Sequence, residues 1–246
     1  MRIILLDIGS EYYDYKVLRE GYMMLDLARL PRYIDLSCVR TDNTMEELQE
    51  MVALAKDYRF CCAFAMPCYT KWVVEQLKEE QDIAVGGTVG FPSGADMTET
   101  KVETAKRFVQ MGVDELDMVI NVQALKNRDY EMVCDDIRRV REVADGRILK
   151  VILEVACLTD GEIQKGSELV ARCGANFVKT GTGWMSAPST VEHIRLIHDA
   201  IGDSIAIKAA GGVRTLNQIE QMIDAGCSRF GIGVRSTKRI LQEAGL

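Results

Sequence analysis

The chain has 246 residues, 48% of them hydrophobic, and a formal net charge of −7 at pH 7. This length supports a full hydrophobic core in one large domain or two small ones. The acidic balance and the lack of a long basic run exclude a nucleic-acid-binding surface, and without an 18-residue apolar stretch we expect no membrane span.

The N-terminal sequence MRIILLDIGS is too short and too interrupted for a signal peptide, so we expect none. The eight cysteines include no CxxC pair and lie mostly in apolar segments. Buried, reduced thiols fit this pattern and indicate a cytoplasmic protein.

His193 and His198 are five residues apart and lie on different faces of one predicted helix. No HxH, HExxH or clustered Cys/His pattern occurs, so we expect no metal site.

The first predicted element is a helix over about residues 15–30, within an extension (1–32) that would cover the N-terminal end of the fold. Short apolar runs then alternate with amphipathic helical patterns. The runs are continuous, as is typical of parallel strands covered by helices. The predicted strands are 33–39, 59–65, 83–90, 115–121, 148–154, 176–180, 204–209 and 228–232. The predicted helices are about 43–56, 69–80, 98–111, 128–144, 159–173, 189–201, 215–225 and 235–244.

Capping residues support several of these helices. The predicted N-terminal caps are Thr159, Ser189 and Thr215. Glycines suited to a left-handed C-terminal position follow three helices at Gly112, Gly174 and Gly226.

Eight β-then-α units predict an α/β protein with a single (β/α)8 TIM barrel over residues 1–246, plus the extra N-terminal helix. A doubly wound open sheet is the alternative. That fold usually has a glycine-rich loop after its first strand, whereas here the first strand is followed by RTDNT.

In a barrel, the chemistry takes place at the C-terminal ends of the strands. Five of the predicted strands provide the charged residues that are poor choices for a plain core: Asp35, Asp117, Lys150 with Glu154, Lys179 and Lys208. Neighbouring parallel strands lie ~4.8 Å apart, so the lysines that end the sixth and seventh strands are expected to be close.

Burial and a like charge both lower the pKa of a lysine, and an uncharged amine forms a Schiff base with a carbonyl. We therefore expect Lys179 to be uncharged most of the time, while Lys208 stays cationic and exchanges protons with Asp117. The alternative is that both lysines are solvated, or that they pair structurally with Asp117 and Glu154.

Glycines follow the last two strands. KAAGGVRT contains Gly211 and Gly212, and FGIGVRST contains Gly231 and Gly233. Such loops let backbone N–H groups approach an anion, and a phosphate site at this position is usual in barrels. The alternative is that they are ordinary turn glycines.

Five motifs together resemble the deoxyribose-phosphate aldolase family, over about Asp35 to Gly233. They are GFPSG (Gly90–Gly94), DELDMVIN (Asp114–Asn121), LKVILE (Leu149–Glu154), FVKTGTG (Phe177–Gly183) and KAAGGVRT (Lys208–Thr215). The resemblance implies an aldehyde-lyase without metal or cofactor. Such an enzyme reversibly cleaves 2-deoxy-D-ribose 5-phosphate to D-glyceraldehyde 3-phosphate and acetaldehyde through a lysine Schiff base, in deoxyribonucleoside and carbohydrate catabolism.

The resemblance also implies residue roles. Lys179 falls on the Schiff-base lysine, Lys208 on the second lysine that tunes its pKa, and Asp117 on the proton-relay aspartate. Asp35 falls on an acidic residue near the substrate hydroxyls. The other implied substrate contacts are Ser37, Lys150, Thr182, Gly183, Gly211, Gly212, Gly231 and Gly233. The implied partners are sugar phosphate and aldehyde substrates, with no nucleic acid or membrane, and a homodimer is the expected assembly.

The sequence departs from the family pattern at three places. The lysine is followed by Thr-Gly-Thr-Gly instead of Thr-Ser-Thr-Gly, so Gly181 lacks a hydroxyl. Trp184 stands where a smaller aromatic or a lysine is common, and Gly233 and Val234 stand where serines are frequent. Two alternatives therefore stay open: a Schiff-base aldolase with another aldehyde acceptor, and a non-catalytic barrel that binds a sugar phosphate.

Overall fold

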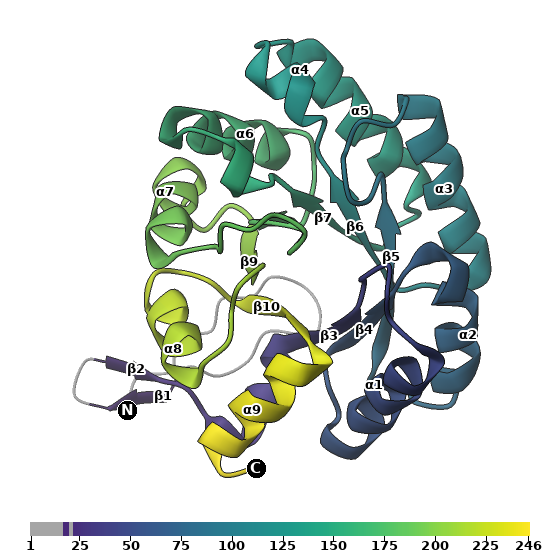
Figure 1. Cartoon of the computed structure of the whole chain (residues 1–246). Coiled ribbons are helices and arrows are strands. Elements are labelled where there is room, and N and C mark those ends of the chain that lie inside the picture. Colours follow the sequence, from purple (N-terminus) through teal and green to yellow (C-terminus); the bar gives the residue numbers. More distant parts are fainter. Residues whose placement is uncertain (1–16, 20–21) are drawn as a thin grey trace.

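A closed barrel of eight parallel strands, ringed by helices, forms the body of the molecule (Figure 1). The computed structural model describes residues 17–19 and 22–246. The barrel strands are β3 (Ile34–Cys38), β4 (Cys62–Ala65), β5 (Ala84–Val89), β6 (Glu115–Val119), β7 (Ile148–Ile152), β8 (Phe177–Lys179), β9 (Ala206–Ala210) and β10 (Arg229–Gly233). Each strand pairs with the next along the chain, and β10 closes the barrel against β3. The predicted (β/α)8 fold is confirmed.

Helices follow the strands on the outside of the barrel. They are α1 (Met45–Tyr58), α2 (Pro67–Leu77), α3 (Thr98–Met111), α4 (Val122–Lys126), α5 (Tyr130–Val143), α6 (Asp160–Arg172), α7 (Val191–Ile201), α8 (Leu216–Asp224) and α9 (Val234–Ala244). The short helix α4 and a 3-10 turn at Val155–Cys157 were not predicted from the sequence. None of the helices in the described part of the chain is long and apolar enough to cross a membrane.

The predicted caps are mostly confirmed. Thr159 and Thr215 each begin a helix with a reciprocal capping box. The prediction for Ser189 is wrong by one residue, because Thr190 caps α7. The Ser189 side chain is buried instead, and its hydroxyl contacts the Thr180 hydroxyl and the Ala210 carbonyl. The three predicted C-terminal glycines all have positive φ.

The helix expected over about residues 15–30 is wrong where the structure describes this segment. Strands β1 (Val17–Arg19) and β2 (Tyr22–Met24) pair antiparallel, and a 3-10 helix (Leu27–Tyr33) follows. Valine and tyrosine favour strands, which agrees with this pairing. Residues 15, 16, 20 and 21 lie outside the described part.

The 3-10 helix packs against the N-terminal end of the barrel. Arg32 near its end donates through Nη1 to the carbonyls of Arg59, Phe60 and Asp82, just before β4 and β5. Its Leu30 is fully buried. This segment therefore lies at the end of the barrel opposite to the C-terminal ends of the strands.

Side chains along each strand point alternately to the outside of the barrel and to its interior, and the two sides differ in polarity. Outward residues such as Leu36, Val151 and Ile207 join one large apolar core between sheet and helices. Inside the barrel, Cys62, Phe64 and Ala84 form only a small separate apolar cluster. Much of the remaining interior is charged, because successive side chains of a strand point to opposite faces.

Candidate active site

Seven charged side chains from six strands meet inside the barrel, and each is at most 7% exposed. They are Asp35 from β3, Glu115 and Asp117 from β6, Lys150 from β7, Lys179 from β8, Lys208 from β9 and Arg229 from β10. We call this set the charged layer. Burying so many ionic groups is costly unless they pair with one another, so their contacts define the site.

Asp117 lies at the centre of the charged layer. Its Oδ2 accepts hydrogen bonds from Lys179 Nζ at 2.6 Å and from Lys208 Nζ at 2.7 Å. Its Oδ1 accepts from Lys150 Nζ at 3.1 Å. The register of the sheet produces this arrangement, because Lys179 pairs directly with Lys208 and Asp117 pairs with Lys150. The predicted proximity of the two lysines and Asp117 is confirmed.

A second set of contacts lies deeper in the barrel. The Arg229 guanidinium pairs with both Asp35 and Glu115, and Lys150 contacts Glu115. Asp35 Oδ2 in turn lies 2.5 Å from Lys208 Nζ. Sequence reasoning missed Glu115 and Arg229. The spacing could have found both, since each lies two residues before an inward-facing position of its strand.

Burial and the neighbouring charges give the lysines different proton affinities. Burial opposes the charge of Lys150, but Asp117, Asp35 and Glu115 hold its pKa well above the ordinary value. At Lys179, burial lowers the pKa to about 8; Asp117 opposes this shift and the charge of Lys208 reinforces it.

Of Lys150 and Lys179, Lys179 therefore loses its proton more readily. At pH 7 a pKa of about 8 leaves about a tenth of it uncharged, against fewer than about one in a thousand for an ordinary lysine. The expectation that it is uncharged most of the time is thus wrong at neutral pH. The layer holds four cationic groups and three carboxylates, so deprotonating Lys179 balances its charges.

Phe64 forms an apolar wall beside the lysines and was not identified from the sequence. Its ring centroid lies 4.5 Å from Lys208 Nζ, 5.0 Å from Lys150 Nζ and 5.9 Å from Lys179 Nζ. Gly86 on the next strand makes room for the ring, because a Cβ there would lie 2.1 Å from it. The ring keeps water from one side of the amines, which supports the burial that lowers the pKa of Lys179.

A cavity of about 710 Å³ opens above the charged layer at the C-terminal ends of the strands. Ten of the predicted site residues line it: Asp35, Ser37, Lys179, Thr182, Gly183, Lys208, Gly211, Gly212, Gly231 and Gly233. Asp117 and Lys150 do not line the cavity and contact Lys179 or its neighbours from within the charged layer. The predicted residues thus form one continuous site.

The glycines at the mouth differ in what they do. Gly183 and Gly211 have positive φ and approach each other closely, since a Cβ on Gly211 would lie 3.4 Å from the Gly183 Cα. Gly212 also has positive φ, and a Cβ there would lie 2.3 Å from Pro188 Cβ. Gly231 lies within β10 instead, where a Cβ would lie 3.2 Å from Lys208 Cε. Its lack of a side chain leaves room for that lysine.

The N-terminus of α9 also faces the cavity. Gly233 caps this helix without a side-chain hydrogen bond, so the first backbone N–H groups lack a side-chain acceptor there. Gly233 pairs in register with Ser37 on β3. Val234, Arg235 and Ser236 line the cavity next to them.

Glu154 explains the unusual Gly181. The Glu154 backbone is left-handed, with φ of 57°, and its side chain is buried. Its carboxylate accepts a hydrogen bond from the Thr182 hydroxyl, and burial raises the pKa of this carboxyl group. A Cβ on residue 181 would lie 2.9 Å from Glu154 Oε1. Gly181 therefore gives the carboxylate space, and Thr182 is held by Glu154.

Trp184 ties the loop after β8 to the opposite rim. Its indole N–H donates to the Val39 carbonyl at 2.8 Å. Its ring meets Phe91 edge-on at 6.0 Å between centroids, and the Arg40 guanidinium lies 5.7 Å from its centre. All three of these partners line the cavity. Trp184 thus helps to shape the cavity entrance.

One group among the described residues has the spacing of metal ligands: Asp35, Cys62 and Glu115. Both carboxylates already pair with Arg229, and burial raises the pKa of the Cys62 thiol well above its usual value. A metal ion needs a thiolate and free carboxylate oxygens, so the donor set favours the ion pairs over a metal.

Comparison with known proteins links this site to a family. Residues 29–243 match the family model described as DeoC/LacD family aldolase. A deoxyribose-phosphate aldolase from Exiguobacterium sp. is 43% identical over 202 residues, covering 82% of this chain and 91% of that protein.

Solved structures agree with the sequence comparison. A Coccidioides immitis protein assigned as a deoxyribose-phosphate aldolase superposes with a TM-score of 0.86 at 34% identity, covering 92% of this chain and 89% of the other. The tetrameric deoxyribose phosphate aldolase from Aeropyrum pernix gives a TM-score of 0.79 at 26% identity, with 88% and 91% coverage.

Proposed function

Since the chain belongs to the DeoC/LacD family of aldolases, we propose that it reversibly cleaves 2-deoxy-D-ribose 5-phosphate to D-glyceraldehyde 3-phosphate and acetaldehyde through a Schiff base on Lys179. One observation carries this assignment. Lys179 and Lys208 share one oxygen of the buried Asp117, and the pKa of Lys179 is lowered to about 8. A barrel that merely binds sugar phosphate has no need of such a nucleophile.

The reaction begins with the uncharged form of Lys179. Its Nζ attacks the aldehyde carbon of the open-chain sugar, and loss of water gives the protonated Schiff base. The charged layer then again holds a cation on this nitrogen, next to the Asp117 carboxylate. The carboxylate therefore stabilises the iminium charge that forms.

Cleavage breaks the bond between C2 and C3 of the sugar. The electron pair passes to C2 and forms an enamine with the nitrogen, while the C3 hydroxyl loses its proton and becomes the aldehyde of glyceraldehyde 3-phosphate. Asp117 and Lys208 relay this proton, and protonation of the enamine at C2 followed by hydrolysis releases acetaldehyde. The shared Asp117 oxygen lets protons pass between the two amines without leaving the site.

The phosphate group occupies the mouth of the cavity between Gly183, Gly211, Gly212 and the start of α9. The positive-φ glycines bring the backbone close to an anion, and the helix N-terminus offers unsatisfied N–H groups. Side-chain hydroxyls are not required for this contact, so the replacement of serines by Gly233 and Val234 is compatible with phosphate binding.

Trapping the intermediate tests the proposal. Sodium borohydride added during turnover of 2-deoxyribose 5-phosphate should reduce an acetaldehyde adduct onto Lys179, located by peptide mass spectrometry. Lys179→Leu should abolish both the adduct and the cleavage. The control Lys165→Leu, at a partly exposed lysine of α6 far from the charged layer, should retain both. An adduct on surface lysines alone would refute the Schiff-base assignment.

Turnover of unphosphorylated 2-deoxyribose tests the phosphate site separately. A strong preference for the phosphorylated sugar is expected, and equal turnover of both would favour another aldehyde acceptor.

We further propose that the protein works in the cytoplasm as a homodimer, which light scattering of the purified chain would test. All eight cysteines are free thiols, which supports a reducing compartment.

A further inference from the structure

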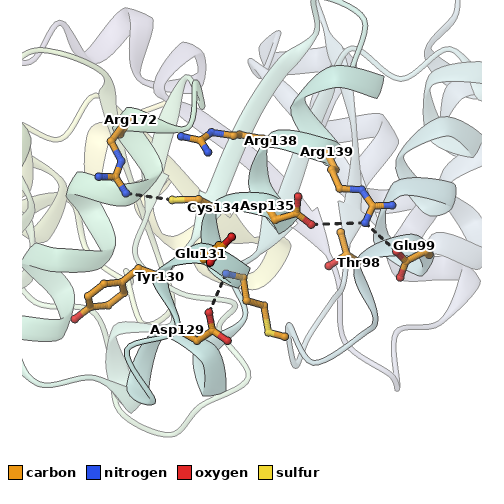
Figure 2. Close-up of a pocket in the computed structure, with 11 residues that line it drawn as sticks. Thr98, Glu99, Asp129, Tyr130, Glu131, Cys134, Asp135, Arg138, Arg139 and Arg172 are labelled. Carbon is orange, nitrogen blue, oxygen red and sulfur yellow. Dashed lines mark hydrogen bonds and ion pairs between the residues drawn. The ribbon is translucent and has the colours of Figure 1, made fainter.

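A second cluster of reactive side chains lies on the outer surface of the barrel. It occupies a groove of about 790 Å³ that is lined by residues of α3, α5 and α6 (Figure 2). The groove shares no lining residue with the cavity at the barrel mouth. Its chemistry is therefore separate from that of the lysine pair.

Cys134 of α5 lines this groove beside two guanidinium groups and is 4% exposed, so a molecule as small as a peroxide can reach it from the groove. Its Sγ accepts a hydrogen bond from Arg172 Nη2 at 3.4 Å, drawn as a dashed line in Figure 2. Arg138, one turn further along α5, adds a second positive charge. Cations next to a thiol favour its thiolate, which is the nucleophilic form of cysteine.

Three of the four carboxylates that line the groove are engaged with other partners, and the fourth is Glu131. Glu99 and Asp135 both pair with Arg139, at 2.8 Å and 3.6 Å. Asp129 accepts the Met132 backbone N–H at the start of α5. Their negative charges are thus partly compensated before they act on the Cys134 sulfur.

Cys173 directly follows Arg172, the residue whose guanidinium reaches Cys134, and it forms the C-terminal cap of α6. Its thiol hydrogen-bonds with that of Cys134. Burial raises the pKa of Cys173 to about 12, and its hydrogen bond with Cys134 adds to this. For Cys134 burial also opposes the thiolate, but the hydrogen bonds from Arg172 and Cys173 and the two arginine charges outweigh it and lower its pKa. By contrast, burial raises the pKa of Cys38, Cys61, Cys62 and Cys227.

We propose that Cys134 is a peroxide-reactive thiol and that Cys173 resolves its oxidised form as a reversible disulfide. The Cys134 thiolate attacks one oxygen of hydrogen peroxide, the O–O bond breaks, and one proton is taken up to release water and leave a sulfenic acid. The Cys173 sulfur then attacks the Cys134 sulfur. The S–O bond breaks, and the hydroxyl leaves with the Cys173 proton as a second water.

Peptide mapping of the full chain tests this proposal. After treatment with hydrogen peroxide and digestion without reductant, we expect a linked peptide pair that joins Cys134 to Cys173 and is lost on adding dithiothreitol. Cys68 is exposed and serves as the reference for unselective oxidation. Oxidation of Cys68 before Cys134, or no linked pair at peroxide concentrations that oxidise Cys68, would overturn the proposal.

Two variants separate the roles of the partners. Cys173→Ser should stop the reaction at the sulfenic acid, so that dimedone labels Cys134. Arg172→Gln should slow Cys134 oxidation about three- to fourfold for each unit by which the pKa of the thiol rises, because the smaller thiolate fraction is partly offset by a more nucleophilic thiolate. Absence of dimedone labelling in the first variant would show that Cys134 forms no sulfenic acid for Cys173 to resolve, and would overturn the proposal. An unchanged rate in the second would exclude the guanidinium as the activating group.

Discussion

Replacing Lys208 by leucine should raise the pH at which Lys179 becomes a nucleophile. Both ammonium nitrogens lie within 2.7 Å of the same Asp117 oxygen, so they are no more than about 5 Å apart. Two like charges at ~5 Å with an effective dielectric of ~20 repel by ~3 kcal/mol, or about two pH units. Removing Lys208 also leaves Asp117 with one fewer competing cation, which further stabilises the charged form of Lys179.

The assay is the rate of borohydride trapping with excess acetaldehyde as a function of pH. In the unchanged protein the rate should rise with a midpoint near the Lys179 pKa of about 8. In Lys208→Leu the midpoint should move up by about two pH units, which slows trapping at pH 7 about a hundredfold. Lys165→Leu is the matched control with an unchanged midpoint. A midpoint that stays in place or falls in Lys208→Leu would refute the reasoning.

Three further predictions follow from the charged layer and the glycine loops. Glu115→Gln should lower the free energy of unfolding by about 3–5 kcal/mol in urea titrations, because it removes one of the two carboxylates that pair with Arg229 and the carboxylate nearest to Lys150. The exposed Glu142→Gln should change it by less than about 0.5 kcal/mol. Gly212→Ala should raise the KM for 2-deoxyribose 5-phosphate by a factor equivalent to about 1–2 kcal/mol, because a Cβ on this left-handed residue would be strained and would clash with Pro188. Acetaldehyde trapping should stay unchanged. Equal losses in both assays would contradict a role of this loop in phosphate binding. The pKa values of Asp35 and Asp117 are lowered in the folded state. Their contribution to stability is therefore fully present above the pKa of about 4 that they have in the unfolded chain, and it is lost as the pH falls. The urea concentration at the unfolding midpoint should decrease from about pH 5 downward, and a midpoint that stays constant down to about pH 3 would disprove this.

The barrel could be predicted because its outer face is regular. Each strand presents outward apolar residues to a helix, and this gives continuous apolar runs separated by capped helices. The position of Lys179 and Lys208 at the ends of consecutive strands was enough to place them side by side. Their registered pairing follows directly from the parallel sheet.

Spacing could have identified Glu115 and Arg229 as inward-facing, but the pairing within this deeper half of the charged layer could not be predicted in the same way. Glu115 and Arg229 begin their strands, where charged residues are usually solvated. Arg229 meets Asp35 across the seam where β10 closes against β3, a contact between residues 194 positions apart. Only closure of the barrel brings these residues together. The helix predicted over residues 15–30 failed for a local reason. A short segment can match the helical period in sequence and still form two short strands that pair with each other, as β1 and β2 do.

The position of Trp184 at the cavity entrance has an optical consequence. The chain has two tryptophans, and the other, Trp72, lies on α2, packed against the outer core. Trp72→Phe would leave a single indole whose N–H binds the Val39 carbonyl and whose ring meets Phe91. Its emission would then report the polarity of the entrance, so filling and emptying of the cavity can be followed in real time by intrinsic fluorescence, without an attached dye.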